Sequence, residues 1–232
     1  MAIENEIHPI QVNILFVLLF RTRARFTELN NLKVPSDQFN FHIKKLIEAT
    51  LIEKTDQFYN LTPKGKEFAN RFDTENLVPE RQAKVSALIC CIRIVGGKTY
   101  YLMQKRLKEP YYGFIGMISG KVKWGELTRE AAIRELKEET GLMGKPHFLG
   151  IEHKIDYDKN GELLEDKFFY IFLVQEFKGN LKRKILGGEN KWMTEKEIMI
   201  SGKTFDDAHD VFSIIKKRNF RFIEKRYSVK KY

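Results

Sequence analysis

Residues 120–142 read GKVKWGELTREAAIRELKEETGL, and this stretch decides how the rest of the chain is interpreted. From Thr128 onward it has the composition of a helix, with Thr128 as an acceptable N-cap and Glu130 as an acidic residue in the first turn. The apolar side chains that this helix can bury belong to Ala131, Ala132, Ile133 and Leu136. Gly141 then supplies the left-handed residue that commonly ends a helix.

Three glutamates of this predicted helix gather on one face. Glu135, Glu138 and Glu139 stand at positions i, i+3 and i+4, which are neighbours on a helix surface. Carboxylates this close repel each other, and a divalent cation relieves the repulsion. Because hard oxygen ligands that leave water in place suit Mg²⁺ or Mn²⁺, the pattern predicts such a metal site. A solvent-facing helix with Glu-Lys pairs would not explain Gly120 or Arg134 at their spacings.

The whole segment resembles the Nudix box, the signature of a family of hydrolases. Gly120, five residues, Glu126, seven residues and then Arg134-Glu135-Leu136-Lys137-Glu138-Glu139-Thr140-Gly141-Leu142 fill every fixed position of that box. The resemblance implies an enzyme that uses Mg²⁺ (or Mn²⁺) to hydrolyse the pyrophosphate of a nucleoside diphosphate linked to another group X.

The resemblance also implies which residues hold the metal. Glu135, Glu138 and Glu139 would be ligands, and the backbone carbonyl of Ser119 would complete the shell. One of the glutamates would act as general base, so Glu135 and Glu139 are the candidate catalytic carboxylates.

Two further positions of the box have supporting roles in this resemblance. Arg134, helped by Glu126, would orient the glutamates, and Gly120 would shape the loop before the helix. The chain departs from the family where many members have Pro-Gly-Gly, because it has Ile118-Ser119-Gly120 instead. A backbone ligand does not need a glycine at residue 119.

Outside the box, several residues are candidates for contacting the substrate. A further acidic ligand or base could be Glu189 or the Glu165-Asp166 pair. Tyr112 and Phe114, like Tyr111, precede the box and could stack on a base. Arg106, next to Lys105 at the end of a predicted strand, could hold phosphate. Tyr157, Tyr170 and Phe172 could line the same cleft, although aromatic residues in strands are more often part of the core.

The region around the box predicts an α/β fold. Strands are expected over 85–95, 98–107, 148–157 and 168–177, and a last helix over 205–218. Strands around a central helix, followed by another helix, indicate an α/β/α sandwich with a mixed sheet. Cys90 and Cys91 are adjacent in an apolar run, so we expect buried residues in a reducing, cytoplasmic compartment.

The N-terminal region has a different pattern. Helices are expected from Pro9 through Phe20, over 26–31 and from Ser36, followed by strands at 51–55 and 58–61 and a helix opened by Thr62-Pro63. This order, with Phe39-Asn40-Phe41-His42-Ile43-Lys44-Lys45-Leu46-Ile47-Glu48, resembles winged helix-turn-helix regulators over residues 8–72. We therefore expect a winged-helix domain at 1–75, a linker at 76–84 and a Nudix domain at 85–232.

The resemblance leaves two roles open for the N-terminal domain. If it binds DNA, its third helix would enter the major groove. The residues that this helix would present are Gln38, Asn40, His42, Lys44 and Lys45. However, the first 80 residues carry 10 Lys+Arg against 11 Asp+Glu. This region therefore lacks the net positive charge that attracts the phosphates of DNA. The alternative is a module for dimerisation or protein docking, and a palindromic site would itself favour a homodimer.

Most of the formal net charge of +10 lies in the second part of the chain, where 152 residues carry 31 Lys+Arg against 20 Asp+Glu. Its basic C-terminal cluster contains Lys216, Lys217, Arg218, Arg221, Lys225, Arg226, Lys230 and Lys231. This cluster either attracts phosphate or nucleic acid or is a solvated helix face with a tail. Three whole-chain hypotheses remain: a hydrolase of nucleotide-like pyrophosphates, a regulator that senses such a metabolite and binds operator DNA, and a hydrolase of RNA 5′ ends. No stretch predicts membrane insertion.

Overall fold

The computed structural model describes residues 7–73 and 81–229. The chain forms two compact units, Met1–Arg81 and Gln82–Tyr232. Most of the predicted linker at 76–84 lies outside the described residues, and Lys84 is already the first residue of a strand. Every helix of the described part is too short or too polar to cross a membrane.

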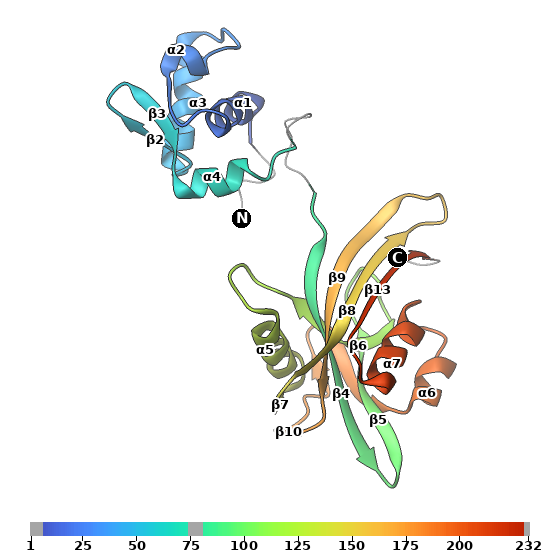
Figure 1. Ribbon diagram of the computed structural model, residues 1–232. Coiled ribbons are helices and arrows are strands. Elements are labelled where there is room, and N and C mark those ends of the chain that lie inside the picture. The colour runs from blue at the N-terminus through green and yellow to red at the C-terminus, as the bar shows by residue number, and fades with distance from the viewer. Residues whose placement is uncertain (1–6, 74–80, 230–232) are drawn as a thin grey trace. The chain divides into compact units, whose positions relative to one another are not determined.

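The first unit is a small helical domain with a short sheet (Figure 1). Its elements are α1 (Pro9–Leu19), β1 (Ala24–Arg25), α2 (Phe26–Leu29), α3 (Ser36–Glu48), β2 (Ile52–Thr55), β3 (Phe58–Leu61) and α4 (Pro63–Ala69). The antiparallel sheet has the order β1-β3-β2. Helix α4 begins as predicted, since the Thr62 hydroxyl accepts a hydrogen bond from the Gly65 N–H. Helix α3 begins at Ser36, as expected, and Pro35 occupies its N-cap position.

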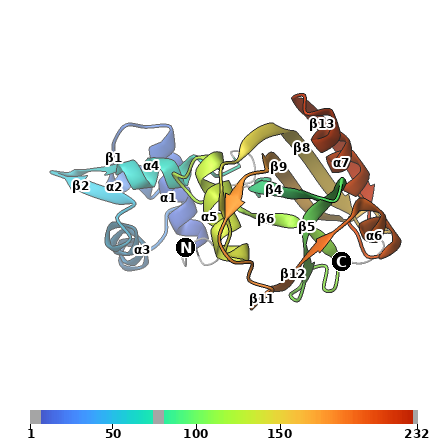
Figure 2. The same ribbon diagram turned by 90° about the horizontal axis from the view of Figure 1, so that it is seen from below.

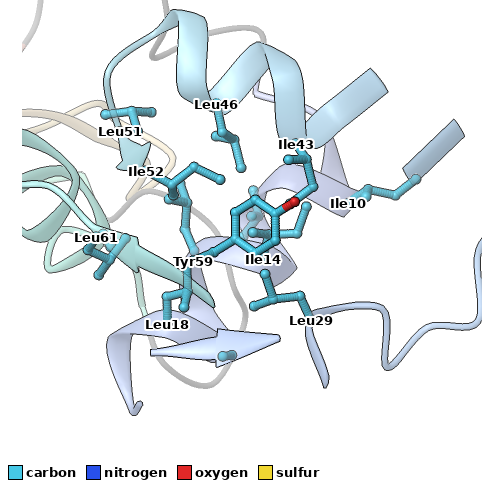
Figure 3. Close-up of a cluster of buried hydrophobic side chains, with 14 of the residues drawn as sticks. Ile10, Ile14, Leu18, Leu29, Ile43, Leu46, Leu51, Ile52, Tyr59 and Leu61 are labelled. Atoms are coloured by element: carbon cyan, nitrogen blue, oxygen red, sulfur yellow. The ribbon is translucent and has the colours of Figure 1, made fainter. Parts of the chain in front are cut away.

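The core of this unit is made where the helices and the hairpin meet. Figure 3 shows apolar side chains from α1, α3 and both hairpin strands packed around Tyr59. Ile14, Leu15 and Leu29 are fully buried there. The apolar spacing of α1 and α3 therefore serves the core of the unit itself.

The second unit is built on an eight-stranded mixed sheet with the order β11-β12-β5-β6-β4-β9-β8-β13. Its long strands are β4 (Lys84–Val95), β5 (Lys98–Arg106), β6 (Ile115–Lys121), β8 (His147–Tyr157), β9 (Leu163–Val174), β12 (Gly188–Met193) and β13 (Arg221–Ser228). Its short strand is β11 (Lys184–Ile185), whereas β7 (Met143–Gly144) and β10 (Phe177–Lys178) pair with each other in a separate two-stranded antiparallel sheet. Strands β4 and β9, and β8 and β13, run parallel, whereas the other neighbours are antiparallel.

Helices cover both faces of this sheet, as the predicted sandwich requires. Helix α5 (Thr128–Thr140) lies on one face, and α6 (Glu195–Ile200) and α7 (Ala208–Lys217) lie on the other (Figures 1 and 2). Side chains of β4 point alternately to the two faces of the sheet and so contribute to both core layers. Cys91 packs under α5, and Cys90 packs on the side of α7. Both cysteines are buried and free, and burial raises their pKa values.

The C-terminal basic cluster is only in part the expected helix face, because Lys216 and Lys217 end α7 whereas Arg221, Lys225 and Arg226 lie on a strand. Residues 221–228 form β13, an edge strand that pairs with β8. Lys216 and Lys225 form ion pairs with Glu195 and Asp210, at Nζ–O distances of 2.7 and 2.6 Å. The cluster is thus partly neutralised, and Lys230 and Lys231 lie outside the described residues.

Candidate functional site

Helix α5 presents the acidic face that the sequence predicts. It begins at Thr128, but Leu127 occupies the N-cap position, so the predicted Thr128 cap is wrong. Instead, the Glu130 carboxylate accepts a hydrogen bond of 3.0 Å from the Leu127 N–H. Gly141 ends the helix with a φ of +76°, and its N–H donates to the Lys137 carbonyl. Ala131, Ala132 and Leu136 are buried against the sheet, which fixes the direction of the opposite face.

Arg134 is the centre of the hydrogen-bond network on this helix. Its Nε and Nη2 donate to the two carboxylate oxygens of Glu126 at 2.7 and 2.8 Å. Its Nη1 donates to Glu135 at 2.5 Å and to Glu138 at 3.2 Å. A further bond from Nη2 to the Lys121 carbonyl, at 3.0 Å, ties the helix to the end of β6. The guanidinium thus fixes two of the three helix glutamates and the loop before the helix.

These contacts shift the protonation of the acids in opposite directions. The hydrogen bonds from Arg134, with a second from the Lys123 N–H, lower the pKa of Glu126 to about 2. Burial raises the pKa of Glu135 despite the Arg134 bond, and the charges of Glu139 and Glu138 raise it further. The mutual repulsion expected from the i, i+3, i+4 spacing is therefore present at Glu135.

The third glutamate is held from the other side. Glu139 accepts a hydrogen bond of 2.9 Å from the Gln104 side chain on β5. Asn190 on β12 donates to the backbone carbonyl of Glu139 at 2.7 Å, and its own side-chain oxygen accepts from Gln104 at 3.2 Å. Gln104 and Asn190 belong to no sequence motif that we recognised, so sequence analysis did not identify them.

Gly120 has a direct steric reason to be glycine. A Cβ built at residue 120 overlaps the carboxyl group of Glu135. The absence of a side chain at the end of β6 therefore allows the Glu135 carboxylate to lie against the strand. Ser119, the preceding residue, lies beside the same glutamates at the wall of a cavity.

This cavity has a volume of about 630 Å³ and contains the box residues at one end. Ser119, Gly120, Arg134, Glu135, Glu138 and Glu139 all line it. Of the predicted substrate residues, Arg106 lines it too, with its Nε donating to the Pro110 carbonyl at 3.0 Å. Its size is that of a typical small-molecule site.

The other predicted substrate residues lie elsewhere. Tyr112 is exposed and outside the cavity lining, and Phe114 packs on the Tyr111 and Phe205 rings behind it. Glu189 lies on β12, is ion-paired with Lys184 at 3.4 Å and does not line the cavity. Of the candidate extra carboxylates, Glu165 does line it.

Strand β8 carries buried charges that sequence analysis missed, and two of them, Lys154 and Asp156, line the cavity. Glu152, Lys154 and Asp156 alternate along β8 and are each at most 4% exposed. Lys154 Nζ lies 3.6 Å from Asp156 and 3.4 Å from Asp207. The alternation Glu152-His153-Lys154-Ile155-Asp156 was the available signal, but it reads as an exposed polar face because a strand seldom buries three charges.

The charges in this network shift each other's pKa values. Burial raises the pKa of Glu152 to about 9, and the neighbouring Asp207 adds to the rise. Burial lowers the pKa of Lys154, but the charges of Asp207 and Asp156 more than offset it, so the net shift is upward. Burial also raises the pKa of Asp156, against the effects of Lys154 and Tyr111. At neutral pH, Glu152 is therefore protonated, and Lys154 is charged.

Helix α3 of the first unit exposes four of the five predicted DNA-contacting residues. Gln38, Asn40, Lys44 and Lys45 are exposed. His42 is not: it is buried, and its ring stacks on His8 at 4.2 Å between centroids. The expectation that the helix presents His42 to solvent is therefore wrong, because His42 lies on the core side of the helix with Phe39, Ile43 and Leu46.

The family match to known proteins lies within the second unit of the chain. The NUDIX domain family model matches residues 84–213. A curated relative, an ADP-ribose pyrophosphatase from Methanocaldococcus jannaschii, is 27% identical over 119 residues, which cover 51% of this chain and 68% of that protein. Among solved structures, the NUDIX domain of Shewanella oneidensis NrtR, crystallised with ADP ribose, is similar with a TM-score of 0.52. At 14% identity, covering 66% of this chain and 96% of that one, this likeness concerns the fold.

Proposed function

This chain belongs to the Nudix family and is a Nudix-type pyrophosphohydrolase; from that premise we propose how its residues divide the work and what the first unit adds. The proposed substrate is a nucleoside diphosphate linked to another group X, bound in the cavity with its pyrophosphate beside the box glutamates. The observation that carries the proposal is the Arg134 network, which holds Glu126 and two glutamates, Glu135 and Glu138, that line a cavity of about 630 Å³.

The donor set fits a divalent cation. Glu135, Glu138 and Glu139 with the Ser119 carbonyl offer hard oxygen ligands of the kind that suit Mg²⁺ or Mn²⁺. Within the described residues no three acidic side chains yet surround a single point, since Arg134 Nη1 lies between two of them. Binding would therefore require a small rotation of these carboxylates. The chemistry that the ion supplies when bound is charge neutralisation on the pyrophosphate and a lower pKa for the attacking water.

The protein's own side chains position the glutamates and remove a proton from the attacking water. Arg134 and Glu126 keep the glutamates in place, and Glu135 or Glu139 accepts the proton of the attacking water. Gln104 holds the Glu139 carboxylate so that it faces the cavity. Arg106, at the same cavity, would contact the phosphates.

The test is product release from a panel of pyrophosphates with Mg²⁺ or Mn²⁺. The panel contains ADP-ribose, which the name of the Methanocaldococcus relative suggests, dinucleotides, nucleoside triphosphates and capped or triphosphorylated RNA. Turnover that disappears in both Glu138→Gln and Glu139→Gln supports the proposal. Turnover that survives both substitutions would overturn it.

For the first unit we propose a winged-helix fold that binds DNA through α3. The supporting observation is that Gln38, Asn40, Lys44 and Lys45 are exposed on one helix. The whole chain could then act as a regulator in which hydrolysis ends the signal, with a homodimer reading a palindromic site. Selection of bound sequences from a random DNA pool tests this role, and no enrichment over a pool without protein would favour a docking module.

A further inference from the structure

One carboxylate oxygen of Asp156 accepts a hydrogen bond, and the other has no hydrogen-bond donor among the described residues. The residue lies on β8, is 1% exposed and lines the cavity. Its Oδ2 accepts a hydrogen bond of 2.7 Å from the Tyr111 hydroxyl. Its Oδ1 has no hydrogen-bond partner within residues 7–73 and 81–229, and Lys154 Nζ lies at the longer ion-pair distance of 3.6 Å. A buried acceptor without a donor is costly, so its retention at a cavity wall points to a ligand.

The other buried atoms without partners in the described residues do not share this position. They are His42 Nδ1, which belongs to the first unit, and Glu152 Oε2. Glu152 lies on the same face of β8 as Asp156, with Lys154 between them, but does not line the cavity. Asp156 alone among these three combines an unsatisfied oxygen with access to the cavity.

The place of Asp156 in the sheet separates it from the box. The strand order β6-β4-β9-β8 puts three inter-strand steps, about 14 Å, between the strand that carries Gly120 and the strand that carries Asp156. Leu88, Met103, Phe169 and Phe205 are among the apolar and aromatic residues that line the cavity. The cavity therefore has an acidic catalytic end, apolar residues along its wall and a far end where Asp156 lies among other lining charges, namely Lys84, Lys154, Glu165, Lys167 and Asp207.

That layout fits a ligand with a flat apolar ring whose edge carries a hydrogen-bond donor. Resting on the proposed hydrolysis of a nucleotide-like substrate, we infer that Asp156 Oδ1 accepts a hydrogen bond from an amino group of the substrate's nucleobase. Asp156 thereby selects bases with an amino group over bases with a keto group at that edge. A metal ion would compete with the charge of Lys154 beside it.

Energetics sets the size of the preference. A hydrogen bond to a buried charged acceptor, compared with leaving that acceptor unpaired, changes affinity by about 10- to 100-fold. A keto oxygen facing the carboxylate adds repulsion. Asp156→Asn inverts this pattern, because its carbonyl can keep the Tyr111 bond while its amide NH₂ faces the cavity as a donor.

The experiment compares binding of AMP, GMP and IMP to the full chain with Mg²⁺ by titration calorimetry. These monophosphates contain no pyrophosphate to cleave, and each amino nucleotide forms a matched pair with IMP. The wild type should bind AMP or GMP at least about 10-fold more tightly than IMP. Asp156→Asn should remove that preference and bind IMP more tightly than the wild type does.

The control variant is Asp166→Asn, which removes the same charge from the neighbouring strand. Asp166 contacts His153 at 3.0 Å and does not line the cavity. The nucleotide preference of the Asp166→Asn protein should therefore match that of the wild type. If Asp156→Asn does not fold, as thermal unfolding would reveal, Tyr111→Phe provides the second variant. Loss of the hydroxyl releases Oδ2 and should weaken the preference without reversing it.

The outcomes separate this inference from the proposed hydrolysis. Unchanged AMP/IMP and GMP/IMP ratios in Asp156→Asn, or a wild type that binds none of the three, would overturn the role of Asp156 even if pyrophosphates are cleaved. A chain that shows the predicted preference but cleaves no pyrophosphate would refute the proposed substrate class and leave the base-binding role standing.

Discussion

Arg134 holds Glu126 with two parallel hydrogen bonds, Nε to Oε1 at 2.7 Å and Nη2 to Oε2 at 2.8 Å, across eight residues of sequence. This bidentate geometry is the strong form of an arginine–carboxylate contact. Both side chains are less than 20% exposed, so solvent screens the pair only partly. Because the remaining guanidinium nitrogen reaches Glu135 and Glu138, Glu126 sets the orientation of acids that it does not itself touch.

Replacement of Glu126 by Gln should lower stability in a pH-dependent way. The pKa of Glu126 is depressed from 4.5 to about 2 by the Arg134 hydrogen bonds, so its contribution is fully present above about pH 4.5. It is then lost as the pH falls towards 2. We expect Glu126→Gln to lower the free energy of unfolding by about 1–2 kcal/mol at pH 7, with a difference from the wild type that shrinks below pH 4.5.

Urea unfolding of both proteins between pH 3 and 7 measures this difference. Glu176→Gln is the matched control, because Glu176 is an exposed glutamate of the same unit. A Glu126→Gln difference that stays constant down to pH 3 would contradict the role of the ion pair.

Gly120→Ala and Ser119→Ala should have opposite consequences although they are adjacent. A methyl group at residue 120 displaces the Glu135 carboxylate, so we expect kcat to fall by about 100-fold or more. Ser119 is proposed to act through its backbone carbonyl, which alanine retains, so Ser119→Ala should stay within about 3-fold of the wild type. Steady-state hydrolysis with thermal unfolding as a check on folding distinguishes the two. Equal losses in both variants would show that the side chain of Ser119 matters.

Features with local causes were predictable from the sequence. The turn between β4 and β5 has positive φ at both Gly96 and Gly97, and a Gly-Gly dipeptide between two apolar runs predicts such a turn. Gly141 ends α5 for the same kind of reason. The three box glutamates share a face because their spacing matches the helical repeat.

Features that depend on distant partners were not predictable. Strand β13 forms by parallel pairing with β8, about 70 residues earlier, and its charged sequence gives no strand period. Asp156 meets Tyr111 across 45 residues, and only the fold shows that its neighbours on β8 are buried. His42 fits an exposed helix position by residue type, but the packing of α3 on α1 buries it.

The buried His42 should make the first unit less stable in mild acid. Burial and the neighbouring His8 lower the pKa of His42 below its usual 6.5, so the native state favours the neutral ring. Stability is therefore full above about pH 6.5 and is lost as the pH falls through the lowered native value. Hydrogen exchange of the α3 amides between pH 7.5 and 5 should show this loss in the wild type and a smaller one in His42→Phe. His147→Phe, an exposed histidine of the other unit, is the control, and equal pH dependence in all three proteins would refute the assignment.

Lys44 and Lys45 should contribute to DNA affinity through phosphate contacts, if the first unit binds DNA as proposed. Each is exposed on α3, although Lys45 also pairs with Glu48 at 2.9 Å. Removing one phosphate contact weakens binding about equally for all sequences and reduces the salt slope of log K by about 0.9. We therefore expect Lys44→Ala to show the full change and Lys45→Ala a smaller one, because the Glu48 carboxylate already offsets its charge. Glu48→Gln is the informative counterpart: freeing Lys45 should strengthen binding, whereas unchanged salt slopes in all three variants would remove α3 from the DNA interface.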